Sequence, residues 1–173
     1  CFIDSSFYLH PDLVTSANRI KKIVDITRPR TAEKYFAQPH KESWHGTMTS
    51  VVCAGDGYLS NGLYKGIASD ANLVLLKVMN KEGKITTENI AGALQWIKKN
   101  HKKYNIRVVN MSLGDDAEGS WKISVVNLLA EELIEQGISI VAAVGNDDKA
   151  IIKPPANSPN VIAVGGWDDN NKL

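Results

Sequence analysis

The fold of this chain is decided by the run Ile138-Ser139-Ile140-Val141-Ala142-Ala143-Val144-Gly145-Asn146. Residues 138–144 are small or apolar and lack a clean period-two alternation, which is typical of a strand covered by helices on both faces. Gly137, just before the run, suits the left-handed turn that commonly ends a helix. The sequence therefore predicts a helix ending near Gln136, then a buried strand, then a polar residue beyond the strand's carboxyl end.

Similar apolar, β-branched runs recur along the chain, separated by longer amphipathic segments. This alternation is the signature of a parallel sheet built from βαβ units. The predicted strands are Cys1–Asp4, Ile23–Ile26, Leu73–Val78, Val108–Met111, Ile138–Val144 and Val161–Val164. We therefore expect an α/β fold with a three-layer, doubly wound and mostly parallel sheet.

Three helices are predicted between these strands. They run from about His45 to Ala54, from about Thr87 to His101 and from about Trp121 to Gln136, and Thr87 is the predicted N-cap of the second. Apolar stripes at helical spacing predict which side chains face inward. They are Ile90, Ala93, Leu94 and Ile97 in the second helix, and Val125, Leu128, Leu129 and Leu133 in the third.

Length and composition narrow the class of protein. The chain has 173 residues, of which 43% are hydrophobic and 23% charged, as is usual for a globular domain. A net charge of +1 provides no general field towards nucleic acid, and no apolar run reaches the roughly 18 residues of a membrane helix. The two cysteines, Cys1 and Cys53, have neither zinc-site spacing nor the numbers for a disulfide framework. Because the sequence starts inside a predicted strand and lacks a closing helix, we expect residues 1–173 to be a single partial domain.

Polar residues that follow predicted strands are the candidates for a functional site, since ligands of open α/β sheets bind beyond the carboxyl ends of the strands. Asp4 closes the first strand, His45 opens a helix after a loop, and Asn146 follows the strand at 138–144. Each has a simpler explanation when taken alone. The aspartate could cap a turn, the histidine could cap a helix, and Gly145-Asn146 could be an ordinary turn.

Six segments of the chain, in order, resemble those of the subtilase family of serine proteases. They are Ile3-Asp4-Ser5, Trp44-His45-Gly46-Thr47, Gly66-Ile67-Ala68-Ser69-Asp70-Ala71-Asn72-Leu73 with Lys77-Val78, Val109-Asn110-Met111-Ser112-Leu113-Gly114, Ala142-Ala143-Val144-Gly145-Asn146, and Asn160-Val161-Ile162-Ala163-Val164-Gly165. The chain is similar to the N-terminal part of a subtilisin-like catalytic domain. The resemblance implies that His45 is the general base, that Asp4 orients it, and that Asn146 donates to the oxyanion.

The same resemblance implies a polypeptide substrate. Ser112, Leu113 and Gly114 would offer a strand edge to an extended peptide, and Ala143 and Gly145 would help to wall the pocket for the residue before the cut. An ordinary loop start, and packing of Ala143 against a helix, are the plain alternatives. Because many subtilases act outside the cell, a secreted or surface location is weakly favoured, although nothing else in the sequence bears on it.

The family's Gly-Thr-Ser nucleophile segment is absent, and no serine of the chain has its context. Subtilases place that serine after all the segments found here, so truncation is the simplest explanation. We expect this chain to be inactive by itself, with the remainder of its own catalytic domain as a partner. Two smaller departures are Ser6, where the family usually has glycine, and Met48, where a second histidine is common.

No cofactor is expected, and no clear metal site is predicted. The loop 55–62 lies where some subtilases bind calcium, and Asp12, Asp56 and Asn61 are oxygen ligands of the right hardness. Calcium requires about six to eight such oxygens. How many of them gather at this loop depends on the fold, so the sequence leaves a calcium site possible.

Two other functions would fit parts of the sequence. A subtilase-like pseudoprotease would bind peptides or regulate a partner without cutting, but such a scaffold has no chemical reason to keep both Asp4 and His45. A nucleotide-binding α/β protein would need a dinucleotide fingerprint, and the candidate Gly55-Asp56-Gly57-Tyr58-Leu59-Ser60 ends on serine and follows a predicted helix instead of a strand.

Overall fold

The sheet at the centre of the molecule has six parallel strands. The computed structural model of the chain describes residues 1–114, 122–146 and 151–166. The strands are β1 (Phe2–Asp4), β2 (Ile20–Asp25), β3 (Leu73–Lys77), β4 (Val108–Met111), β5 (Ser139–Ala143) and β6 (Ile162–Val164). Their order across the sheet is β2-β3-β1-β4-β5-β6, and every neighbouring pair is parallel. The predicted α/β class and the predicted parallel strands are confirmed.

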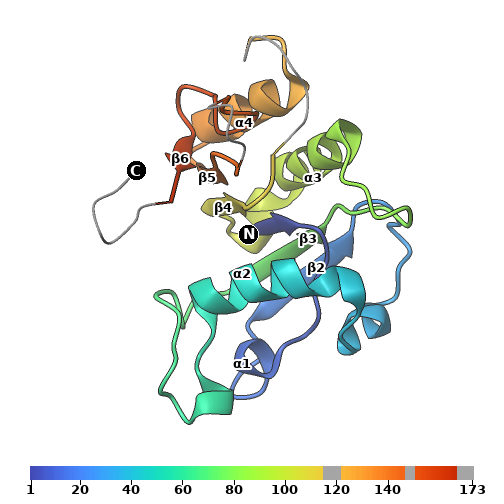
Figure 1. Ribbon diagram of the computed structural model, residues 1–173, viewed down its shortest axis with the longest axis vertical. Helices are drawn as coiled ribbons and strands as arrows, with labels where there is room; N and C mark the ends of the chain where they lie inside the picture. The colour runs from blue at the N-terminus through green and yellow to red at the C-terminus, as the bar shows by residue number, and fades with distance from the viewer. Residues whose placement is uncertain (115–121, 147–150, 167–173) are drawn as a thin grey trace.

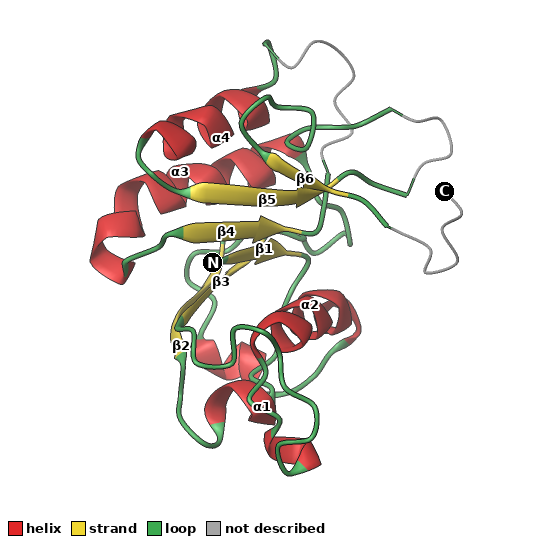
Figure 2. Ribbon diagram, turned by 90° about the vertical axis from the view of Figure 1, so that its left-hand side faces the viewer, coloured by secondary structure: helices red, strands yellow, loops and turns green. Residues whose placement is uncertain are grey.

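Helices cover both faces of this sheet and form three layers. They are α1 (Pro11–Val14), α2 (Trp44–Ala54), α3 (Thr87–Tyr104) and α4 (Val125–Glu135), with 3-10 turns at Glu33–Ala37, Lys41–Ser43 and Tyr58–Ser60. Helices α3 and α4 lie on one face and α1 and α2 on the other (Figures 1 and 2). Two clusters of buried side chains fill the two interfaces. Among the described residues, none of the helices combines the length and the apolar character needed to span a bilayer.

Strands β1 and β3 are buried on both faces, as the sequence predicted for Leu73–Val78. The same prediction was wrong for the strand at 138–144, because Ser139 and Ala143 of β5 are exposed and only one face of that strand is covered in the described part of the chain. All five residues of β3 are buried, including Lys77, whose ammonium lies 3.2 Å from a carboxylate oxygen of Asp25 at the end of β2. The carboxylate of Asp25 also accepts hydrogen bonds from the hydroxyls of Thr27 and Thr31, and Lys77 Nζ donates to the carbonyl of Met79. A buried charge is tolerated only when it is paired and hydrogen-bonded in this way.

Two of the three predicted helices lie where the sequence placed them. Helix α2 begins one residue before His45, and α3 ends three residues beyond His101. The predicted stripe of α3, residues 90, 93, 94 and 97, is buried. The predicted N-cap was wrong by one position, because the hydroxyl of Thr86, and not that of Thr87, accepts from the backbone N–H of Asn89.

The third helix differs more from its prediction. It begins at Val125, because the hydroxyl of Ser124 accepts from the backbone N–H of Asn127 and caps it there; Trp121 lies outside the described residues. The predicted inward positions Val125 and Leu128 are wrong, being 43% and 49% exposed. The buried residues are Val126, Asn127, Ala130 and Leu133. The apolar pattern missed this face because it contains the polar residue Asn127. The side-chain amide of Asn127 is buried and donates a hydrogen bond to the Asn157 side chain at 2.8 Å.

Candidate active site

The candidate site lies at the carboxyl edge of the sheet, as expected for an open α/β sheet. Strand β1 pairs with β4 so that Ile3 is opposite Met111, and β4 pairs with β5 so that Met111 is opposite Ala142. The next residues along these strands, Asp4, Ser112 and Ala143, therefore leave the sheet at the same level. Helix α2 begins beside this edge and packs against β1.

Asp4 and His45 are brought into direct contact although 41 positions separate them in the sequence. Nδ1 of His45 lies 2.7 Å from Oδ1 of Asp4. The Asp4 side chain is 2% exposed, whereas that of His45 is 34% exposed. A carboxylate has no proton to donate at neutral pH, so this geometry assigns the Nδ1 proton to the histidine ring. In the neutral form of the ring, the other nitrogen, Nε2, then carries no proton and can accept one.

Further donors surround the buried Asp4 carboxylate. Oδ1 lies 2.7 Å from the backbone nitrogen of Ser5 and 3.1 Å from its hydroxyl, and Oδ2 lies 3.2 Å from the hydroxyl of Thr49. Hydrogen bonds of this kind stabilise a buried carboxylate in its charged form.

The contact between Asp4 and His45 depends on a glycine. A Cβ atom at Gly46 would lie 2.3 Å from the carbonyl oxygen of Ser6 and 2.9 Å from both Cβ of Asp4 and a ring carbon of Phe7. Only a residue without a side chain allows α2 to lie this close to the segment after β1. The next residue, Thr47, fixes the pair of segments further, because its hydroxyl accepts from the backbone N–H of Tyr8 at 2.9 Å.

His45 faces a cleft of about 520 Å³. Its walls come from β1, the loop before α2, the segment after β3 and the end of β4, and the lining residues are Asp4, Ser5, Lys41, Glu42, Trp44, His45, Met79, Gly83, Ile85, Ser112 and Leu113. Trp44 is 66% exposed, and its ring stands perpendicular to that of His45 with 5.3 Å between the centroids. The cleft thus combines a histidine poised to accept a proton with apolar walls open to solvent.

The predicted substrate residues divide into two groups. Ser112 and Leu113 line the cleft, and the Ser112 hydroxyl accepts from the Asn110 amide at 3.0 Å. Gly114 is exposed and follows them directly. Ala143 ends β5 on the same edge of the sheet, and Gly145, with φ of 100°, and Asn146 follow it, both exposed. Neither Ala143, Gly145 nor Asn146 is among the residues that line the cleft with His45.

Several residues of the site were missed by the sequence analysis. Ser5 and Thr49 contact the Asp4 carboxylate, and Trp44, Met79 and Ile85 wall the cleft. The spacing of Thr49, four residues after His45 in a predicted helix, was a signal available in the sequence, because side chains four apart lie on the same helix face. Nothing comparable marks Met79 and Ile85, which meet through an isolated antiparallel bridge.

The candidate calcium ligands serve as partners for the backbone. Oδ1 of Asp12 accepts from the backbone N–H of Leu59 at 2.9 Å, and Oδ1 of Asp56 accepts from that of Tyr58 at 3.0 Å. Asn61 ends the short 3-10 turn at Tyr58–Ser60 with a φ of 51°. Within residues 1–114, 122–146 and 151–166, no three His, Cys, Asp or Glu side chains are grouped to hold a metal ion. These contacts do not test calcium binding, which stays the open alternative to the expectation that no cofactor is bound.

Known proteins similar to this chain match it along most or all of its length. The subtilase family matches residues 1–173. Serine protease AprX of Bacillus subtilis (strain 168) is 33% identical over 177 residues, which cover 98% of this chain and 38% of AprX. The cuticle-degrading serine protease of Arthrobotrys oligospora (strain ATCC 24927 / CBS 115.81 / DSM 1491) is 33% identical over 130 residues, which cover 75% of this chain and 29% of that protein.

Solved structures share the fold. The S41 psychrophilic protease superposes with a TM-score of 0.74 at 24% identity, over 97% of this chain and 52% of its own. Sphericase superposes with a TM-score of 0.69 at 25% identity, over 99% of this chain and 56% of its own. The chain therefore spans little more than half the length of these structures, and about a third of the sequence relatives named above.

Proposed function

The chain belongs to the subtilase family, and from this premise we propose that it is the part of a serine endopeptidase domain that carries the general base, its orienting acid and one edge of the substrate site. The catalytic serine would lie in chain beyond these 173 residues. The observation that supports this most directly is the 2.7 Å contact between Nδ1 of His45 and Oδ1 of the buried Asp4, at the wall of an open cleft.

In this proposal His45 moves one proton through the reaction. The serine hydroxyl attacks the scissile carbonyl carbon and gives its proton to Nε2 of His45, while the carbonyl π electrons move to the oxygen. When the C–N bond breaks, the imidazolium returns that proton to the leaving amine. Water then releases the acyl group with His45 acting as base again. Asp4 keeps the proton-bearing Nδ1 aimed at itself and stabilises the imidazolium, and it does not become protonated.

The remaining site residues have supporting roles in the proposal. The side-chain amide of Asn146 would donate to the oxyanion as charge develops on it. The edge formed by Ser112, Leu113 and Gly114 would pair with an extended substrate backbone, which suits the position of the first two in the cleft wall. Ala143 and Gly145, both small, would leave room for the substrate side chain before the cut.

Among the residues that the structure describes, no helix covers half of one sheet face, which favours a further part of the domain. This part of the sheet is the face of β4, β5 and β6 opposite α3 and α4. It carries the row of paired residues Asn110, Val141 and Ile162 and the neighbouring Val108 and Val164, and none of the described helices lies over them. Figure 2 shows α2 on this side beneath the half of the sheet that holds β1, β2 and β3. Parallel sheets of this class are normally covered on both faces.

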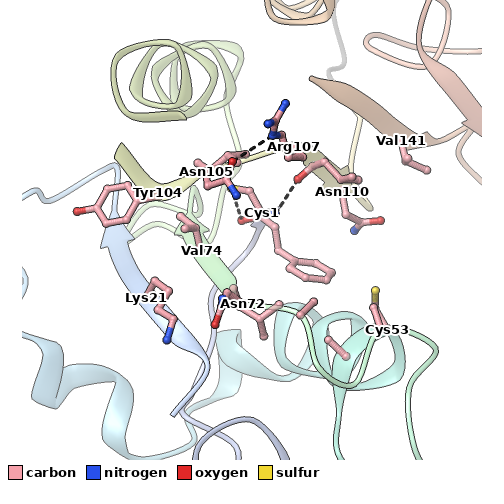
Figure 3. A pocket seen from close by; sticks show the side chains of 17 residues that line it. Cys1, Lys21, Cys53, Asn72, Val74, Tyr104, Asn105, Arg107, Asn110 and Val141 are labelled. Carbon is pink, nitrogen blue, oxygen red and sulfur yellow. Dashed lines mark hydrogen bonds between the residues drawn. The ribbon is translucent and has the colours of Figure 1, made fainter. Parts of the chain in front are cut away.

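The uncovered face also contains a hollow. A cavity of about 560 Å³ lies between the sheet and the end of α2, with Val74, Asn110 and Val141 on the sheet side and Cys53 on the helix side (Figure 3). Its lining is mainly apolar. Val108, which belongs to this lining, is 50% exposed, and Ile162, which pairs with Val141 of the lining, is 55% exposed. We infer that the remainder of the catalytic domain packs an apolar element on this face, in keeping with the limited share of each relative that this chain spans.

Active-site labelling tests the proposed function. A fluorophosphonate reacts with a serine only when a base activates it, so the complete protein should be labelled, whereas His45→Ala in the complete protein and the 173-residue chain alone should not. His101→Ala is the matched control, because His101 lies at the far end of α3 and contacts the Lys98 carbonyl instead of an acid. Full labelling of the His45→Ala protein would contradict the role of His45. A folded complete protein that is never labelled would point to a peptide-binding module instead.

A further inference from the structure

The second oxygen of the Asp4 carboxylate has a partner of its own. Oδ1 receives the contacts from His45 and Ser5. Oδ2 lies 3.2 Å from the hydroxyl of Thr49, which is the one hydrogen-bond donor to that oxygen in the described part of the chain. A carboxylate held through one oxygen alone can still turn about its Cβ–Cγ bond. A donor on the other oxygen removes that freedom.

Thr49 and His45 approach Asp4 from the same helix. They are four positions apart in α2, so they lie on one face of the helix, one turn from each other. Each side chain contacts a different oxygen of the same carboxylate. Helix α2 therefore holds Asp4 at two points, and the plane of the carboxylate is set by the helix that carries the histidine.

We propose that Thr49 is a positioning residue, which keeps the Asp4 carboxylate oriented for its hydrogen bond to His45. The inference rests on the proposed function in one respect, namely that His45 is the general base. Thr49 would contact neither substrate nor serine, and it would act on the reaction only through Asp4. Without it, the carboxylate can rotate, and the Nδ1 proton of His45 loses a fixed acceptor. A residue that contacts only Asp4 can still matter for the reaction, because active-site groups must be held close to their productive geometry.

A purely structural role for Thr49 has to be separated from this one. Its hydroxyl also lies 3.0 Å from the carbonyl oxygen of Gly46, three residues earlier, a contact that threonine commonly makes in helices. The hydroxyl has a single proton, so only one acceptor receives it at a time. Ser50 provides the matched control, because its hydroxyl donates to the Thr47 carbonyl at 2.9 Å with the same spacing and has no contact with Asp4.

The hydrogen bond between His45 and Asp4 can be observed by proton NMR in the 173-residue chain, without any activity. A proton held between an imidazole and a carboxylate resonates far downfield and exchanges slowly with water. In Thr49→Val, which keeps the shape but lacks the hydroxyl, we expect this Nδ1 proton to move upfield and to exchange about tenfold faster, as for loss of one hydrogen bond to a charged group. Thr49→Ser should restore the parental signal, and Ser50→Ala should leave it unchanged.

Three results would overturn the proposal. They are an unchanged Nδ1 signal in Thr49→Val, a Thr49→Ser signal as altered as that of Thr49→Val, and an equal change in Ser50→Ala. Should the valine variant not fold, Thr49→Ala replaces it, since alanine favours helices. In an active complete protein, Thr49→Val should lower kcat about tenfold with KM unchanged, and an unaltered kcat counts against the proposal. An inactive complete protein would remove the proposed function, while the NMR comparison still decides the role of Thr49.

Discussion

Replacing Gly46 by alanine should separate Asp4 from His45 while leaving the fold recognisable. The added Cβ would lie 2.3 Å from the carbonyl oxygen of Ser6, which is backbone and cannot rotate away. Ordinary van der Waals contacts of a Cβ atom begin at 3.4 Å. The helix and the segment after β1 must therefore separate by about 1 Å. Overpacking of this kind typically costs about 1–3 kcal/mol of unfolding free energy.

The effect on the site should exceed the effect on stability. His45 is the neighbour of Gly46 in α2, and its Nδ1 lies 2.7 Å from Oδ1 of Asp4. A displacement of about 1 Å would lengthen this contact beyond hydrogen-bonding range. In the complete protein, a misplacement of that size can cost about 100-fold in rate. We therefore expect Gly46→Ala to lose the low-field Nδ1 proton and most of the activity, yet to remain folded at 25 °C.

Denaturant unfolding and proton NMR of the 173-residue chain measure both effects. Gly92→Ala is the matched control, because Gly92 also lies inside a helix but its added Cβ would meet only a side-chain methyl of Ile26, at 3.1 Å. Alanine is the better helix former by roughly 0.8–1.0 kcal/mol, so this variant should be neutral or stabilised and should keep the Nδ1 signal. If Gly46→Ala had parental stability and an unchanged Nδ1 signal, the close approach at Gly46 would not be what builds the site.

Two further outcomes concern regions outside the cleft. Ile162 is 55% exposed, so Ile162→Lys should change the unfolding free energy of the 173-residue chain by less than about 0.5 kcal/mol. If this sheet face is covered in the complete protein, the same substitution should destabilise that protein by several times as much. Equal changes in both proteins would argue against such a cover. Burial raises the pKa of Glu131, but hydrogen bonds from Ser158 and Asn160 together outweigh it and hold that pKa below its ordinary value of 4.5. Because the folded pKa is the lower one, this carboxylate should stabilise the fold above about pH 4.5 and lose its contribution as the pH falls through the folded pKa. Chemical denaturation between about pH 5 and pH 3 should therefore show a steeper loss in the parent than in Glu131→Gln, and parallel curves would contradict the assignment.

Most of the sheet could be predicted because its signal is local. A strand buried on both faces, such as β3, has an unbroken apolar run, here Leu73-Val74-Leu75-Leu76 before Lys77, and this pattern needs no knowledge of its neighbours. Helix α4 shows where local patterns fail. Its inward face includes Asn127, a polar residue that is buried only because Asn157, 30 positions later, accepts its amide. Choosing the most apolar stripe therefore rotated the predicted face by about one residue.

The site was predicted in part for the same reason. Asp4 and His45 stand in recognisable segments at element boundaries, so both were named from the sequence, and the structure brings them together. The structure leaves Asn146 exposed beyond β5, outside the cleft that His45 lines, so its role as oxyanion donor stays a prediction. Trp44 and Met79 were missed because a cleft wall is defined by the segments that surround it, and these come from distant parts of the chain.

By itself, the sequence of this protein determined the alternation of strands and helices, the family resemblance and the choice of Asp4 and His45 as candidate site residues, since each depends on residues near one another in the chain. Tertiary structure alone decided that Asp4 and His45 lie 2.7 Å apart, that Thr49 contacts the second carboxylate oxygen, and that none of the described helices covers half of one sheet face. Such contacts depend on how closely two backbones approach, and here the absence of a side chain at Gly46 sets that distance.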